Sequence, residues 1–174
     1  MSAVIDSHSD DHHHGPAKGI TRWLYTTNHK DIGTLYLWFS FLMLFLGGAM
    51  AMVIRAELFE PGSQIVSPEF YNQMLTNHGL IMVFGAVMPA FVGLANWIIP
   101  MQIGAPDMAL PRMNNWSFWI LPPAFLMLAA TRFMEGGAPA FGRTFYAPLS
   151  KTYAAPSDAL FIFAIHIHGE SYII

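Results

Sequence analysis

The chain alternates between long apolar runs and short polar segments. Runs without any charged residue cover residues 33–54 and 78–103, and shorter apolar runs cover residues 116–130 and 159–174. About 20 apolar residues in a helix are enough to cross the hydrocarbon core of a bilayer. The pattern therefore predicts an all-α integral membrane protein, with a transmembrane helix bundle of three to four helices within residues 21–174.

Residues 1–20 differ from the rest of the chain. They are polar and include the histidine run from His12 to His14. Their low hydrophobicity predicts a disordered tail, and the lack of an apolar stretch argues against a cleavable signal peptide. The histidines could bind a metal, but a flexible tail offers no fixed ligand geometry.

The composition supports the membrane class and excludes some functions. The chain is 54% hydrophobic and 11% charged, whereas soluble domains carry about 25% charged residues. A net charge of −3 argues against nucleic acid binding, and the absence of cysteine excludes disulfides and thiolate metal sites. The twelve methionines fit apolar packing better than copper ligation.

The placement of lysine and arginine predicts the orientation. Lys18, Arg22 and Lys30 precede the first apolar run, whereas residues 57–76 contain three glutamates and no lysine or arginine. By the positive-inside rule, the N-terminus lies in the cytoplasm. Residues 131–158 would then face outward, although they carry three basic residues, against the rule.

Polar residues near the ends of the apolar runs are the candidates for chemistry. His78 begins the second run, where a histidine either forms a hydrogen bond at a helix start or binds a metal. Arg55 and Glu57 follow the first run, where they could simply reach the headgroups or the solvent. Asp107 lies in the next polar loop, as a loop residue, a helix cap, or part of an ion or proton path.

Several strings of the sequence, taken in order, resemble the N-terminal part of subunit I of the cytochrome c oxidases, which belong to the haem–copper oxidase superfamily. They are Thr27 to Gly33, Asn77 to Met82, Asn96-Trp97, and Gly104 to Asn115. The resemblance covers roughly residues 20–171. It implies the core subunit of a terminal respiratory oxidase, which takes electrons from cytochrome c, reduces dioxygen to water and pumps protons.

The resemblance also implies cofactor and metal ligands. His78 matches an axial ligand of the low-spin haem A, and Arg55 matches the hydrogen-bond partner of the haem formyl group. Neutral imidazole is a common haem ligand. Glu57, Gly62 and Gln64 match contacts of a calcium or sodium site on the outer face, and oxygen ligands suit such hard cations.

A proton path is implied as well. Asp107 matches the entrance of the family's proton-uptake channel, and four neutral residues match its polar lining: Asn96, Asn114, Tyr36 and Ser117. A carboxylate at the mouth would collect protons, and the neutral side chains would hold a file of water along which protons move.

Further parts are expected outside this sequence. The second haem and the copper site would come from segments after residue 174, and the partners would be oxidase subunits II and III, cytochrome c and membrane lipid. The expected location is the inner (cytoplasmic) membrane of a bacterium, in preference to the mitochondrial inner membrane. Two alternatives stay open: a quinol oxidase of the same superfamily, and a truncated, non-catalytic membrane remnant.

Three positions depart from the family pattern. Arg143 stands where the family has a tryptophan near the haem propionates, and His168 and Glu170 stand where it has apolar or small residues. A charge inside a membrane helix is costly unless it is paired, so Glu170 favours the remnant alternative.

Overall fold

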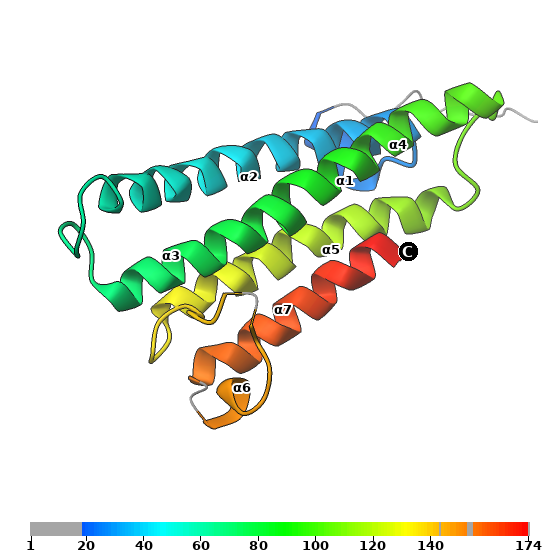
Figure 1. Ribbon diagram of the computed structural model, residues 1–174. Coiled ribbons are helices and arrows are strands. Elements are labelled where there is room, and N and C mark those ends of the chain that lie inside the picture. The colour runs from blue at the N-terminus through cyan, green and yellow to red at the C-terminus, as the bar shows by residue number, and fades with distance from the viewer. Residues whose placement is uncertain (1–18, 143, 153–154, 174) are drawn as a thin grey trace, which may run out of the picture.

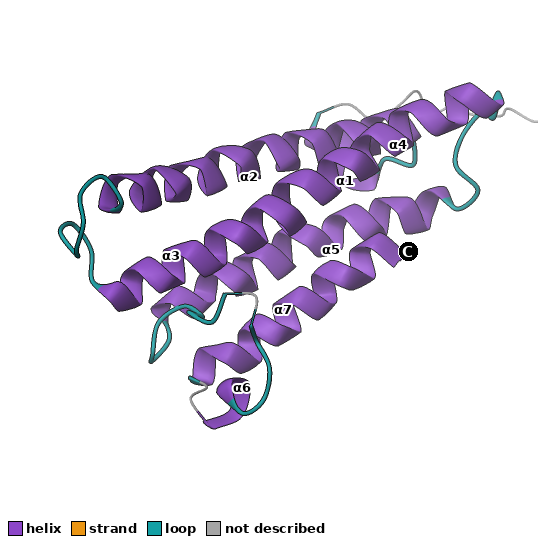
Figure 2. Ribbon diagram, in the orientation of Figure 1, coloured by secondary structure: helices purple, strands orange, loops and turns teal. Residues whose placement is uncertain are grey.

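The computed structural model describes residues 19–142, 144–152 and 155–173, and every regular element in these ranges is helical (Figures 1 and 2). The elements are α1 (Ile20–Tyr25), α2 (His29–Glu57), α3 (Pro68–Leu80), the π-helix η1 (Ile81–Val87), α4 (Met88–Ile103), α5 (Pro111–Ala130), the 3₁₀-helix η2 (Thr131–Phe133), α6 (Leu149–Thr152) and α7 (Pro156–Ile173). Residues 1–18, which make up most of the predicted tail, and Arg143 lie outside the described residues.

The long helices form an up-and-down bundle (Figure 1). Helix α2 runs in one direction, the continuous rod of α3, η1 and α4 returns, α5 runs out again, and α7 returns beside α5. We call the end that holds the start of α2 and the 104–110 loop the amino-terminal end, and the other the opposite end. Two helices, His29–Glu57 with 29 residues and Pro68–Ile103 with 36, are long and apolar enough to cross a membrane.

The helices extend beyond the apolar runs because caps set their ends. The second long helix begins at Pro68 rather than near residue 78, since the Ser67 side chain accepts a hydrogen bond from the backbone N–H of Phe70 at 3.3 Å. The first begins at His29, where Asn28 caps the backbone N–H of Lys30 at 2.8 Å. Helix α5 begins at Pro111, a favourable first position for proline.

The remaining differences in helix bounds are small. Helix α2 continues to Glu57, three residues beyond the apolar run that ends at residue 54, and α7 begins at Pro156 rather than at residue 159. Helix α1 covers Ile20–Tyr25, so Ile20 of the predicted tail is helical. The apolar runs mark the part of each helix that can face lipid, not its full length.

Close contact between α2 and α4 depends on two glycines. A Cβ atom at Gly93 would lie 2.9 Å from the carbonyl oxygen of Gly33, and a Cβ atom at Gly33 would lie 2.8 Å from the carbonyl oxygen of Gly93. Small residues let membrane helices approach backbone to backbone. This contact brings α2 and α4 together at the amino-terminal end, beside the buried Tyr36.

The π-helix η1 lies between α3 and α4 and forms hydrogen bonds with two neighbouring helices, α2 and α7. Its wider turns change the backbone hydrogen bonding, and two of its carbonyl oxygens accept side-chain hydroxyls from neighbouring helices. Ser40 of α2 donates to the carbonyl of Ala86 at 2.6 Å, and Tyr172 of α7 donates to the carbonyl of Phe84 at 2.6 Å. The irregular segment is therefore held from two sides.

The outer face of α2 is apolar and exposed. Trp38, Phe41, Leu42 and Phe45 are each more than half exposed. Trp38 lies three and four residues before Phe41 and Leu42, and Phe45 lies four and three residues after them, so the four form one stripe along the helix. A continuous apolar surface of this kind fits contact with lipid or with other hydrophobic helices.

Candidate functional site

His78 is held by a hydrogen bond to a neighbouring helix. Its Nδ1 atom lies 2.8 Å from the carbonyl oxygen of Gly47 in α2. A carbonyl oxygen can only accept a hydrogen bond, so Nδ1 carries the proton of the neutral ring and Nε2 keeps its lone pair. Nε2 is therefore the atom that can bind a metal, and the bond from Nδ1 fixes the orientation of the ring, as in many metal sites.

The surroundings of His78 include a large apolar cavity. It has a volume of about 580 Å³ and lies among α3, η1, the segment near Phe145, and α7. Gly79 and Leu80, the two residues after His78, line it, but His78 itself does not. The same helix thus presents the imidazole and an apolar wall on adjacent faces.

Arg55 lies near the end of α2 that is closer to His78. Eight residues separate it from Gly47, which corresponds to about 12 Å along a helix axis. The side chain is exposed, and within the described ranges its guanidinium has no hydrogen-bond or ion-pair partner. It is available to pair with a group outside the described residues.

Glu57 is buried, so of the two interpretations left open by the sequence, a carboxylate that simply reaches the solvent does not hold. Its side chain is only 5% exposed. One carboxylate oxygen accepts the backbone N–H of Gln64 at 2.9 Å, and the other accepts those of Ile65 at 2.8 Å and Val66 at 3.0 Å. Three such bonds favour the ionised carboxylate and fold the loop after α2 back onto the helix end.

The other two predicted contacts of the cation site lie in the same loop. Gly62 has a φ of 101°, a turn conformation that favours glycine. The side-chain Nε2 atom of Gln64 donates to the carbonyl of Pro61 at 3.3 Å, and the side-chain oxygen of Gln64 stays available as an acceptor. Among the described residues, no group of three or more histidines and carboxylates comes together as a ready-made metal site.

Four of the five residues predicted to form the proton path are joined by hydrogen bonds. Asn114 Nδ2 donates to Asn96 Oδ1 at 2.6 Å, and Ser117 Oγ donates to the Asn114 carbonyl at 2.7 Å. The Tyr36 hydroxyl lies 2.8 Å from Ser117 Oγ. This polar chain, Asn96–Asn114–Ser117–Tyr36, connects α4, α5 and α2 inside the bundle, and Tyr36 is fully buried.

His29 extends the polar chain and was not among the predicted site residues. Its Nδ1 atom donates to the backbone carbonyl of Asn96 at 2.7 Å, and the ring is buried. The signal in the sequence was a histidine directly after the capping residue Asn28 at the start of a membrane-length helix. Without knowing that α4 lies beside that start, the histidine could not be assigned to the chain.

Asp107 lies outside the hydrogen-bonded chain. It is half-buried in the 104–110 loop, and its Oδ1 atom accepts the backbone N–H of the next residue, Met108, at 2.7 Å. This loop connects α4, which contains Asn96, to α5, which contains Asn114 (Figure 1). Asp107 therefore lies at the same end of the bundle as the two asparagines.

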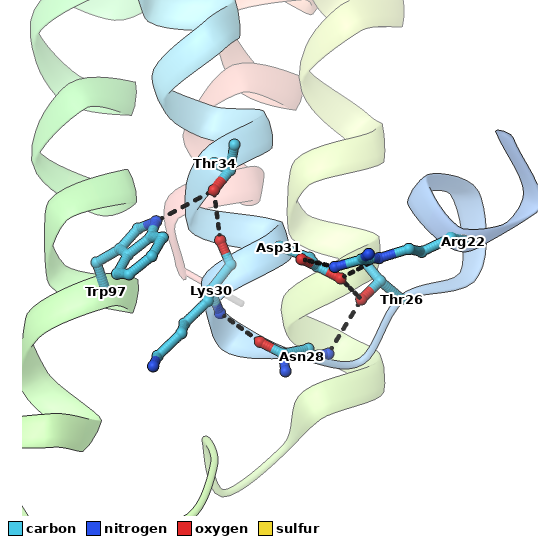
Figure 3. A network of polar contacts seen from close by, with 7 residues as sticks. All are labelled: Arg22, Thr26, Asn28, Lys30, Asp31, Thr34 and Trp97. Carbon is cyan, nitrogen blue, oxygen red and sulfur yellow. Dashed lines mark hydrogen bonds and ion pairs between the residues drawn. The ribbon is translucent and has the colours of Figure 1, made fainter. Parts of the chain in front are cut away.

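A polar network fixes the amino-terminal end of α2 (Figure 3). The carboxylate of Asp31 accepts two bonds from Arg22, at 2.8 and 3.1 Å. This hydrogen-bonded charge pair raises the pKa of the Arg22 guanidinium and ties α1 to α2. On the other side, Trp97 of α4 donates to the hydroxyl of Thr34 at 3.2 Å. These contacts hold α1, α2 and α4 together next to the polar chain.

The two departures on α7 differ in environment. His168 is buried, and its Nδ1 atom donates to the carbonyl of Ala164 in the same helix at 3.1 Å. Glu170 is exposed, and its carboxylate has no hydrogen-bond or ion-pair partner in the part of the chain that the structure describes. Neither residue contacts the polar chain through a hydrogen bond that the structure shows.

The fold and these sites define an all-α helical bundle of the membrane-embedded class, with a fixed imidazole in one half and a buried polar chain in the other. Residues 31–174 match the model of the family described as "Cytochrome C and Quinol oxidase polypeptide I". The chain belongs to this family, which confirms the resemblance and the predicted fold class.

Individual relatives agree. The chain is 46% identical over 141 residues to the "Probable cytochrome c oxidase subunit 1-alpha" of Streptomyces avermitilis. The aligned region covers 81% of this chain and 24% of the relative. It is 45% identical over 144 residues to the "Cytochrome c oxidase subunit 1" of Corynebacterium diphtheriae. This aligned region covers 82% of this chain and 26% of the relative. The chain thus spans about a quarter of the length of these relatives.

Proposed function

We propose that this chain is the N-terminal part of the core subunit of a terminal respiratory oxidase. The reaction would be the reduction of dioxygen to water by electrons from cytochrome c, coupled to proton pumping. The relatives carry the name cytochrome c oxidase, which favours cytochrome c over quinol as the donor. The observation that carries the proposal is the fixed imidazole of His78, with Nδ1 bonded to the Gly47 carbonyl and Nε2 left as a ligand.

We further propose that His78 binds a low-spin haem A. The residues fit such a group, because the Gly47 carbonyl holds the ring in one orientation and Nε2 keeps the lone pair that a haem iron would bind. A haem bound there would supply one-electron transfer with little structural change. Arg55 would donate hydrogen bonds to the formyl oxygen, since its guanidinium is otherwise free in the described structure.

The polar chain would serve proton uptake. Asp107 would collect protons at the amino-terminal end and pass them toward Asn96 and Asn114. Ser117 and Tyr36 can each donate and accept a hydrogen bond, so they can pass a proton along the chain. The amides of the two asparagines would position water rather than carry a proton, because an amide does not ionise near neutral pH.

The remaining assignments rest on the family. The second haem and the copper would be held by the rest of the subunit, and subunits II and III would complete the assembly. The location would be the cytoplasmic membrane of a bacterium, with the N-terminus in the cytoplasm. A calcium or sodium ion at Glu57 and Gln64 would use lone pairs that the loop's hydrogen bonds leave open.

The haem assignment is tested with His78→Ala in the full-length subunit, assembled in its membrane complex. We expect the optical absorption of the low-spin haem to disappear, because the imidazole ligand is lost. His166→Ala is the matched control, since its exposed ring bonds only the carbonyl of Ile162 in its own helix. An unchanged spectrum in His78→Ala would exclude this histidine as the ligand.

The proton assignment is tested with Asp107→Asn in the same complex. Turnover and pumping should fall while the haem spectrum stays unchanged, because the substitution removes the collecting carboxylate without touching the fixed imidazole. Glu60→Gln, an exposed carboxylate at the opposite end, serves as the control. Normal turnover and pumping in Asp107→Asn would refute the entry role.

A further inference from the structure

An open pocket lies at the amino-terminal end of the bundle, apart from the haem and proton sites. It has a volume of about 490 Å³, and it is lined by Leu24 and Tyr25 of α1 and by one face of α5 from Arg112 to Ile120. Helix α1 is a short helix without buried residues that precedes α2, so the pocket lies between this surface helix and the beginning of a bundle helix.

The pocket carries one positive charge and no negative charge. Arg112 is its only charged lining residue. The side chain is exposed, and within the described ranges it has no hydrogen-bond or ion-pair partner, in contrast to Arg22, which Asp31 neutralises. An unpaired guanidinium in a pocket is suited to bind phosphate or carboxylate oxygens.

Two further donors in the pocket lack acceptors. Asn115 and Trp119 both line it, and the Asn115 Nδ2 and Trp119 Nε1 atoms are buried without a hydrogen-bond partner. A buried N–H without an acceptor costs free energy, and an acceptor atom in the pocket would recover it once the side chain rotates to bring the N–H into the pocket. Arg112, Asn115 and Trp119 lie three and four residues apart, so they share one helix face.

The location favours a lipid over a soluble anion. Trp116, which also lines the pocket, is 66% exposed, and Tyr25 is 80% exposed. Exposed tryptophan and tyrosine at the end of membrane helices settle at the level of the lipid headgroups. Beyond the donors, the lining continues with apolar Leu24 and Ile120, so the pocket joins a polar part to an apolar part.

We propose that this pocket binds an anionic phospholipid. Arg112 pairs with the headgroup phosphate, Asn115 and Trp119 donate to ester or headgroup oxygens, and an acyl chain lies along Trp116 and Ile120. The lipid thereby fixes α1 against α5 and covers the side of α5 that bears Asn115, next to the polar-chain residue Asn114. The site depends on the membrane bundle and not on the proposed haem or proton roles.

The test uses the full-length subunit in its purified, delipidated complex. Phosphatidylglycerol binding is measured by native mass spectrometry and by the rise in unfolding temperature on adding the lipid. Arg112→Gln should weaken binding by about tenfold or more, because a charge-assisted bond is lost. Arg132→Gln is the matched control, since Arg132 lies at the opposite end over the ring of Phe70, and it should bind like the wild type. Trp119→Phe should weaken binding less.

Four results would overturn the proposal. The first is equal binding of phosphatidylglycerol by Arg112→Gln and the wild type, and the second is equal affinity for phosphatidylcholine and phosphatidylglycerol. The third is full competition by inorganic phosphate at the same concentration, and the last is no binding of added phosphatidylglycerol by the complete complex. The third would indicate a site for a free anion, and the last would indicate that another part of the assembly fills the pocket. Folding of each variant is checked by its haem spectrum, which this pocket should not affect.

Discussion

The carbonyl oxygen of Gly47 determines which nitrogen of His78 can act as a ligand. This contact joins residues 31 positions apart in the sequence, and only the packing of α3 against α2 creates it. The sequence could identify His78 as a candidate, because it begins an apolar run, but it could not identify the ring nitrogen. The orientation of the imidazole is a tertiary property.

Glu57 shows the same limit for a charged residue. In the sequence it follows a membrane-length run, where a carboxylate normally reaches water. The chain turns at Gly62 and brings the backbone N–H groups of residues 64–66 back to the carboxylate. A loop that returns to its own helix end is not visible in hydrophobicity, so the burial of this carboxylate could not be predicted.

Replacing this carboxylate should loosen the loop. In Glu57→Gln one oxygen remains as an acceptor, but the charge that strengthens the three backbone bonds is lost. We expect faster amide hydrogen exchange at Gln64, Ile65 and Val66, and a larger effect in Glu57→Ala, which removes both oxygens. Glu60→Gln, in the exposed part of the loop, should leave the exchange unchanged. Equal exchange rates in Glu57→Ala and the wild type would contradict this role.

At the scale of helices, the sequence predicted an all-helical structure, and its two longest apolar runs lie in the two helices that are long and apolar enough to cross a membrane. An apolar run long enough to cross a bilayer must form a helix or part of a closed barrel, because the backbone has to satisfy its own hydrogen bonds in lipid. The ends of the helices could be predicted less well, because Ser67, Asn28 and Pro111 start the helices within polar sequence, before the apolar runs begin. The π-helix was not predicted, because its apolar residues carry no signal that separates it from an α-helix.

The glycine contact between α2 and α4 should be sensitive to a single methyl group. In Gly93→Ala the new Cβ atom would lie 2.9 Å from the backbone oxygen of Gly33 and 3.0 Å from the Cβ atom of Tyr36. The helices must separate, and overpacking of this kind costs about 1–3 kcal/mol. We expect a lower unfolding temperature in a fixed detergent.

Gly48→Ala is the matched control for this contact. It lies on α2 as well, and a Cβ atom there meets nothing within 4 Å among the described residues. Its unfolding temperature should equal or slightly exceed that of the wild type, because alanine favours helix more than glycine does. Equal losses of stability in both variants would mean that the effect comes from the helix itself and not from the α2–α4 contact.

At the scale of the whole bundle, the arrangement separates two kinds of chemistry. His78 and Arg55 belong to one half, and the polar chain with His29 and the Asp107 loop belongs to the amino-terminal end (Figure 1). The resemblance could select the residues of the chain, but their direct bonding across α4, α5 and α2 follows only from the fold. Asp107 was expected at its entrance, and the structure places it in the adjoining loop without a direct bond.

The link between Tyr36 and Ser117 provides a test of the chain as a unit. Tyr36→Phe and Ser117→Ala each leave a buried hydroxyl without one partner, which should lower stability by about 1–3 kcal/mol. The double variant should lose less than the sum of the two, because neither partner then remains unsatisfied. Turnover of the full-length complex should fall in both single variants without a change in the haem spectrum, since the hydroxyl pair is cut in each. Strictly additive stabilities and normal turnover would show that the two hydroxyls act independently, and the polar chain would then be a packing feature of the bundle.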